Sequence, residues 1–186
     1  MKKLMGLFVI VLVLTGCSWD KSDVSDGLKL RQLLQSEDRY VFTAEITADY
    51  GDRIYTFTMD CGTDGTGDVD FSVVHPESIQ GISGSITQTG GRLVFDDTVL
   101  LFDSLTQGQV TPVIGPWLMI KAIQGGYIQA VSEQNGKEEL VIDDTFGTEK
   151  FRMLLELGEE GFPCGCEIYW QNRRMLTIKI SNFQKE

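Results

Sequence analysis

The chain has 186 residues, of which 42% are hydrophobic, 16 are Lys or Arg and 27 are Asp or Glu. This length and apolar fraction suffice for one or two domains with a real core, and they exclude collagen-like and disordered classes. The formal net charge of −11 excludes a nucleic-acid-binding protein, because phosphate binding needs a basic surface. It also argues against electrostatic docking on anionic lipid.

The chain begins with the features of a bacterial lipoprotein signal. Two lysines precede an unbroken apolar run over residues 7–14, which is too short to span a bilayer as a mature helix. The tetrapeptide Leu-Thr-Gly-Cys that ends at Cys17 looks like a lipobox, in which the cysteine is diacylated and the chain is cut before it. The alternative is a plain signal peptide with an incidental cysteine. We expect a signal peptide over residues 1–16, a lipidated N-terminus and short tether over 17–25, and a single domain over 26–186.

Removal of this signal changes the charge of the protein. The remaining 170 residues carry 14 basic and 27 acidic side chains, a net charge of −13. An anionic membrane repels such a domain, so two acyl chains on Cys17, palmitate for example, must hold it there. We therefore expect a lipid-anchored protein on the extracytoplasmic face of the cell membrane or envelope.

A helix and a series of strands follow the tether. Ser25 or Asp26 can cap a helix whose leucines recur at helical spacing and which ends near Ser36. From Tyr40 the apolar period changes to two, which predicts strands with one buried and one polar face. Such strands are expected at residues 40–48, 55–61 and 69–73, with shorter ones at 84–89, 92–95 and 98–102.

The second half of the chain contains one more helix and five more strands. Thr111 and Pro112 suit a helix start, the regular helix can begin only at Pro116, and Gly125-Gly126 ends it. Strands follow at residues 127–133, 137–143, 151–157, 162–170 and 176–181, the first two joined by a turn containing Asn-Gly. About eleven strands, mostly in hairpin connection, predict a mainly β (α+β) domain. Its curved antiparallel sheet has helices covering the concave face.

The concave face is expected to carry more Tyr, Phe, Met and Leu than two helices can cover. This excess predicts an apolar cavity, and a fully packed core of the same residues is the alternative. A ligand there would bind through burial of apolar area, at ~25 cal/mol per Å² before entropy costs. The expected lining consists of Tyr40, Phe42, Tyr55, Phe57, Phe71, Phe95, Trp117, Phe151, Met153 and Ile168.

Three stretches resemble the lipoprotein-localisation factor (LolA/LolB-like) superfamily. They are residues 71–79, a strand that ends before a proline; residues 91–103, a strand, a turn and a strand; and residues 111–123, similar to the helix that plugs the open barrel. The resemblance implies an open, incomplete β-barrel whose cavity takes acyl chains of lipids or lipoproteins. The lipobox adds a resemblance to the anchored receptor branch. Transport members of the superfamily place an arginine, which helps govern opening, where this chain has His75, a candidate switch residue.

Three cysteines remain after lipidation takes Cys17. By strand alternation Cys61, Cys164 and Cys166 all fall on inner, apolar faces. An exported protein permits a disulfide, and Cys61 joined to Cys164 or Cys166 could stabilise the fold by up to ~4.7 kcal/mol. The alternative is three buried thiols that behave as small apolar groups. A zinc site is not indicated, because the ligand spacing is wrong.

The sequence contains no motif that indicates catalysis. It has one histidine, no nucleophile elbow and no phosphate loop. Asp60, Asp64, Asp68 and Asp70 surround a glycine-rich turn but lack EF-hand spacing, which favours a solvated turn over a calcium site. We expect no enzyme, no cofactor and no metal, but a membrane-anchored lipoprotein that binds a lipid or other apolar ligand. The alternative is an envelope protein-interaction, sensor or accessory module with a packed core and an acidic docking face.

Overall fold

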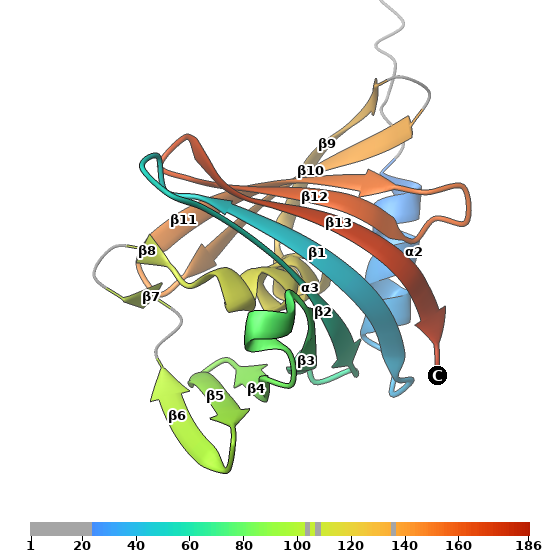
Figure 1. Ribbon diagram of the computed structural model, residues 1–186. Coiled ribbons are helices and arrows are strands. Elements are labelled where there is room, and N and C mark those ends of the chain that lie inside the picture. Colours follow the sequence, from blue (N-terminus) through green and yellow to red (C-terminus); the bar gives the residue numbers. More distant parts are fainter. Residues whose placement is uncertain (1–23, 103–104, 107–108, 135–136) are drawn as a thin grey trace, which may run out of the picture.

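The structure is a computed structural model that describes residues 24–102, 105–106, 109–134 and 137–186. These residues form one eleven-stranded antiparallel sheet, a separate two-stranded ribbon, two α-helices and two short 3-10 helices (Figure 1). No helix within these ranges is both long and apolar enough to cross a membrane. The expected signal peptide, Cys17 and nearly all of the expected tether lie outside the described residues.

The elements follow one another with short connections. In chain order they are α2 (Ser25–Leu34), β1 (Tyr40–Asp49), β2 (Ile54–Thr63), β3 (Val69–His75), η1 (Glu77–Ile79), β4 (Ser83–Thr87), β5 (Gly90–Phe95), β6 (Thr98–Phe102), β7 (Leu105–Thr106), β8 (Gln109–Val110), η2 (Pro112–Ile114), α3 (Gly115–Gly125), β9 (Tyr127–Gln134), β10 (Lys137–Phe146), β11 (Glu149–Leu157), β12 (Pro163–Trp170) and β13 (Arg173–Lys185).

The sheet consists of two meanders, β1 to β6 and β9 to β13, which join where β1 pairs with β13. Its strand order is β6-β5-β4-β3-β2-β1-β13-β12-β11-β10-β9. The first strand therefore lies beside the last, with Tyr40 opposite Lys185 and Ala48 opposite Leu176. The two edge strands, β6 and β9, do not pair with each other, so the curved sheet stays open. The predicted fold class, a mainly β protein with an open, incomplete barrel, is confirmed.

The alternation of apolar residues builds the inner face of the sheet. Along β1, every second residue from Tyr40 to Ala48 is at most 4% exposed, while the residues between them are partly exposed. The same alternation buries Met153 on β11 and Ile168 on β12. Because side chains alternate between the two faces of a strand, one face of the sheet becomes the core.

The helix α3 lies on the inner face of the sheet, and α2 lies beside α3 (Figure 1). At the start of α3, a Cβ on Gly115 would be 3.1 Å from methyl groups of Leu176 and Ile178 on β13. Just after its end, a Cβ on Gly126 would be 2.7 Å from Ile142 on β10. The helix thus crosses the concave side from the middle of the sheet towards its β9 edge, and the predicted helical cover is confirmed.

Candidate functional site

Most of the predicted lining residues meet in one buried cluster on the concave side. Eight of the ten are at most 8% exposed: Tyr40, Phe42, Phe57, Phe71, Trp117, Phe151, Met153 and Ile168. A side chain that lined an open cavity would keep part of its surface accessible to water. These eight do not, so they pack against other protein atoms in this structure. They could line a ligand site only after a neighbouring element moved.

Tyr55 and Phe95 do not lie with the other eight. Their exposed fractions are 45% and 47%, and neither belongs to the buried cluster. Tyr55 stands near the start of β2, with its ring edge-on to Tyr50 at 6.0 Å between centroids. Phe95 ends β5, in a hairpin that projects from the body of the protein (Figure 1). The expectation that these two residues share the interior is therefore corrected: about half of each side chain is open to water, near the start of β2 for Tyr55 and at the end of β5 for Phe95.

The element that fills the concave side is α3. Eight of its eleven residues are buried: Gly115, Pro116, Trp117, Leu118, Met119, Ile120, Ala122 and Ile123. The Trp117 ring packs edge-on against Phe146, with 5.2 Å between ring centroids. The Lys121 ammonium donates to Asp144 at 2.6 Å and to the carbonyl of Thr145 at 3.0 Å. The helix is thus an apolar plug, and among the described residues its charged contact with the sheet is the Lys121–Asp144 pair.

Polar side chains fasten the C-terminal end of this plug to α2. Arg31 Nε donates to the carbonyl of Ile123 at 2.6 Å, and a second Arg31 nitrogen donates to the carbonyl of Gly126. Gln35 donates to the Gln124 carbonyl at 2.8 Å, and the Gln124 side chain donates back to α2 at 2.7 Å. We call Arg31, Gln35 and Gln124 the helix latch. It places a positive charge where the last carbonyls of a helix lack partners.

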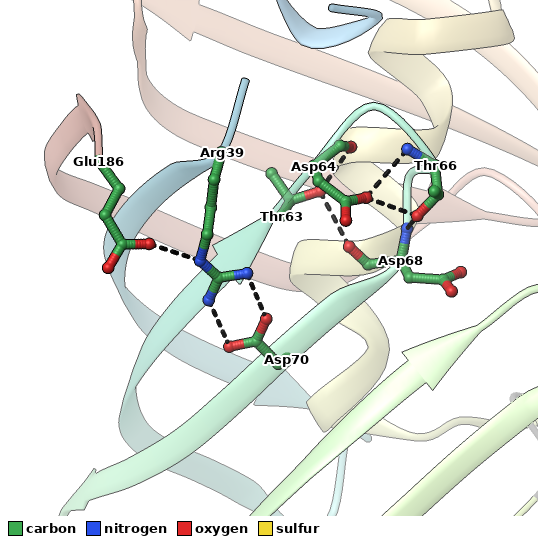
Figure 2. A network of polar contacts seen from close by, with 7 residues as sticks. All are labelled: Arg39, Thr63, Asp64, Thr66, Asp68, Asp70 and Glu186. Atoms are coloured by element: carbon green, nitrogen blue, oxygen red, sulfur yellow. Dashed lines mark hydrogen bonds and ion pairs between the residues drawn. The ribbon is translucent and has the colours of Figure 1, made fainter. Parts of the chain in front are cut away.

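A second polar cluster joins strand ends on the outside of the sheet (Figure 2). The Arg39 guanidinium makes two bonds of 2.9 Å to Asp70, and its Nε donates to Glu186 at 2.5 Å. The Asp70 carboxylate, followed by that of Glu186, raises the pKa of Arg39 above its ordinary value. Both side chains of the Arg39–Asp70 pair are about half exposed, so its net contribution is small. The cluster is a structural clasp between the ends of β1, β3 and β13.

The aspartate-rich turn after β2 is closed by its own hydrogen bonds (Figure 2). Asp64 accepts bonds from the hydroxyl and the backbone N–H of Thr66, which lower the pKa of the Asp64 carboxyl. The buried Thr63 hydroxyl donates to the carbonyl of Asp68 at 2.9 Å. Burial, with the Asp64 charge as a lesser cause, raises the pKa of Asp68. In the ranges that the structure describes, no three His, Cys, Asp or Glu residues gather in a way that could hold a metal ion.

The cysteines of the described ranges are not joined by a disulfide. Cys61 lies on β2 and Cys166 on β12, and both β1 and β13 separate these two strands. Three strand spacings amount to about 14 Å, twice the greatest Cα separation that a disulfide bridges. Of the two alternatives that the sequence left open, the structure therefore favours free thiols over a bond from Cys61 to Cys164 or Cys166. Cys61 and Cys166 are buried thiols, and their burial raises the pKa of each.

His75 lies at the end of β3, opposite Thr58, and is exposed. The peptide bond that follows it, to Pro76, is cis. Its position at a strand end agrees with the sequence pattern, whereas a switching role remains a prediction.

A shallow groove of about 1010 Å³ lies on the other face of the sheet, across β9 to β12. Val141, Arg152 and Leu154 line it, and along their strands they alternate with buried residues. Tyr127 and Tyr169 stand at its two sides, and Arg152 Nε donates to Asp143 at 2.8 Å. This groove mixes charged and apolar groups, in contrast to the uniformly apolar concave side.

No family model matches the sequence, and no curated protein matches it either. Solved structures share its fold. A LolA superfamily protein from Nitrosomonas europaea matches with a TM-score of 0.50 and 8% identity, over 87% of this chain and 92% of that one. A domain from Vibrio parahaemolyticus, named for outer membrane lipoprotein sorting, matches with a TM-score of 0.50 and 11% identity, over 88% of this chain and 94% of that one. A conserved protein from Thermus thermophilus matches with a TM-score of 0.50 and 7% identity, over 88% of this chain and 87% of that one. The chain thus has a LolA-like fold, as the resemblance implied, and identities this low concern the fold alone.

Proposed function

We propose that the protein is an extracytoplasmic lipoprotein of the cell envelope that binds an apolar ligand without catalysis. Acyl chains on Cys17 anchor it to the membrane. The ligand is an acyl chain of a lipid or a lipoprotein, and it binds on the concave face of the sheet, where α3 lies in the present structure.

The observation that carries this proposal is the way α3 is held. Its contacts with the sheet are almost all apolar, and within the described ranges the side-chain hydrogen bonds that hold it are those of Lys121 and the helix latch. A shift of the helix therefore breaks few hydrogen bonds. The apolar contacts that the sheet loses in this shift can be replaced by contacts with an apolar ligand. A helix of 11 residues is about 16 Å long and about 10 Å wide, a space that accommodates an acyl chain. Each buried CH₂ group of such a chain contributes about 0.8 kcal/mol.

The anchoring part of the proposal rests on the N-terminal sequence. The described domain starts at Val24, and the chain from Cys17 to Val24 reaches at most about 25 Å when extended. The folded body then stays close to the membrane while its net charge of −13 opposes adsorption on anionic lipid. The names of two of the matched structures, which refer to the LolA superfamily and to lipoprotein sorting, support a role in the envelope.

Native mass spectrometry of the full chain, expressed in bacteria and extracted in mild detergent, tests both parts. Covalent acyl chains add a mass that survives collisional activation, and the Cys17→Ser variant loses it. A bound ligand adds a further mass that activation removes. A chain that carries the covalent mass and never a removable one would refute the binding proposal while leaving the anchoring intact.

The helix latch offers a matched pair of variants for the same experiment. Arg31→Met keeps the aliphatic stem but removes the two bonds to the end of α3. Lys29→Met removes a neighbouring cation whose partner, Asp26, lies on α2 itself. If α3 gives way to the ligand, Arg31→Met changes the fraction of ligand-bound chain and Lys29→Met does not. Equal occupancy in both variants would contradict a moving helix.

A second candidate function is the protein-interaction module, and the packing of the concave side favours it. The interior side chains are packed closely: Met59 and Ile120 are 0% exposed and the large Trp117 ring only 2%, so the described core has no open space for a ligand. In that case the extracted protein carries a stoichiometric protein partner and no removable lipid mass. The same spectra therefore separate the two functions.

A further inference from the structure

The β5–β6 hairpin exposes an unusual amount of apolar surface. It projects from one end of the sheet (Figure 1), and Val99, Leu100 and Leu101 on β6 are 46%, 57% and 81% exposed. Pairing places Val99 beside Val94 on one face of the hairpin and Leu100 beside Leu93 on the other. Monomeric proteins rarely leave clustered apolar side chains in water, so this exposed cluster marks the hairpin as an interaction surface.

The tip of the hairpin argues against a lipid bilayer as the partner of this surface. Asp96 and Asp97 form the two-residue turn, with φ of 47° and 61°. If the hairpin entered a membrane with its turn first, both carboxylates would be buried. Among the described residues, no Lys or Arg forms an ion pair with either aspartate. A cover of protein leaves the tip in water.

The backbone of β6 is ready to pair with another strand. β6 is the last strand of the sheet, and of the described strands it pairs with β5 alone. Phe95 and Thr98 flank the two-residue turn, so they form a hydrogen-bonded pair, and the alternation makes the pairs at Val99 and Leu101 non-hydrogen-bonded. The N–H and C=O groups of Val99 and Leu101 therefore point away from β5. Such a free edge is a template for strand addition.

We propose that the occupant of this edge is β6 of a second copy, paired antiparallel about a two-fold axis at Leu100. In this register Val99 faces the partner's Leu101, and Leu101 faces the partner's Val99. Both pairs are of the hydrogen-bonded kind, so the outward groups of the two copies form four main-chain hydrogen bonds. Leu100 faces the partner's Leu100 in the closer, non-hydrogen-bonded kind of pair. All of these cross-strand neighbours are apolar, so the edge is complementary to itself, as a two-fold interface requires.

The contact is small, which determines where it forms. One strand edge buries less than the roughly 1,200 Å² of a stable standard interface, so isolated chains in solution associate weakly. Two chains anchored in one membrane have a much higher effective concentration. This step rests on the anchoring proposed above, and it places the dimer in the membrane-bound protein.

Disulfide crosslinking of the full chain in bacterial membranes tests the register. Leu100→Cys places two cysteines in a non-hydrogen-bonded pair, about 4.5 Å apart at Cα, which a disulfide bridges. Leu101→Cys places them about 8 Å apart, which a disulfide does not bridge. Ile54→Cys, on β2 and 67% exposed, reports random collisions. After mild oxidation we expect a dimer on a non-reducing gel for Leu100→Cys, at least ten times stronger than for Leu101→Cys, Ile54→Cys or the parent chain.

Each other result overturns the pairing. A Leu100→Cys dimer no stronger than that of Ile54→Cys excludes the proposed contact, and equal dimers from Leu100→Cys and Leu101→Cys exclude its register. A crosslinked product of another mass identifies a different protein as the occupant. Membrane fractionation of the same cells reports the anchoring separately. A chain that remains in the membrane without crosslinking refutes the dimer and not the anchor, and thermal unfolding of Leu100→Cys shows that the variant folds.

Discussion

The substitution Arg31→Met tests whether the helix latch holds α3 in place. It removes two hydrogen bonds from a charged donor to the carbonyls of Ile123 and Gly126, the first of 2.6 Å and partly buried. Hydrogen bonds to charged groups contribute about 1.5 kcal/mol or more each, and the partial exposure of Arg31 reduces this contribution. We therefore expect a loss of about 2 to 3 kcal/mol in the free energy of unfolding. For a chain of this length that loss lowers Tm by about 4 to 12 °C.

The assay is thermal unfolding of the full chain in detergent, followed by circular dichroism. Lys29→Met is the matched control, because Lys29 lies on the same helix and makes an exposed ion pair with Asp26, a kind of pair that contributes less than about 1 kcal/mol. If Arg31→Met lowers Tm by no more than this control does, the contacts between α2 and the end of α3 do not stabilise the fold. The reasoning about a fastened plug would then be refuted.

Three further predictions concern the interior, a close strand approach and a turn. Burial raises the pKa of the Cys61 and Cys166 thiols, so iodoacetamide should modify them only after denaturation, and mass spectrometry that finds rapid native labelling would contradict their burial. Gly84→Ala should lower Tm, because its Cβ would lie 2.1 Å from a backbone oxygen of β5. Gly125→Ala, whose Cβ has no atom within 4 Å, should raise the free energy of unfolding by up to about 1 kcal/mol. Equal Tm values for Gly84→Ala and Gly125→Ala would exclude the close approach of β4 to β5 at Gly84. The lowered pKa of Asp64 means that its carboxylate stabilises the fold at neutral pH, and this contribution is lost as pH falls through the lowered value. Asp64→Ala should therefore melt below the parent chain at neutral pH and together with it in strong acid, and a gap that persists in acid would contradict this assignment.

The local pattern of the sequence predicted the eleven strands of the sheet, its two helices and most of the buried strand faces, but it missed η1 and the β7–β8 ribbon. The alternation that starts at Tyr40 placed the buried residues of β1 correctly, because the direction of a side chain on a strand depends only on its position along that strand. The helix at Gly115–Gly125 was predicted for a similar reason, since its flanking glycines and prolines act locally. These features need no knowledge of the rest of the chain.

The sequence did not predict which elements lie side by side or how far apart their residues are. Alternation put Cys61, Cys164 and Cys166 on the inner face; Cys61 and Cys166 are buried there, whereas Cys164 is half-buried. The separation of Cys61 from Cys166 depends on the two strands that come between them. Phe95 has the right position in its strand and is exposed because the hairpin extends beyond the covered part of the sheet. The latch residue Arg31 bonds to a carbonyl 92 positions away, which no local signal marks. Each of these outcomes depends on the order of strands and on what packs beside them.

The pairing of β1 with β13 has a consequence for the order of events during biogenesis. Because Tyr40 lies opposite Lys185, the middle of the sheet cannot close until nearly the whole chain has been delivered. A polypeptide that emerges from its amino end must wait with one side of β1 unpaired, and contacts between such distant segments form slowly. The N-terminal meander is then exposed to chaperones, proteases and other chains until β13 has been made. The sheet is therefore complete only when β13 has been made, and a chain truncated before β13 leaves β1 and β12 without the strand that joins them.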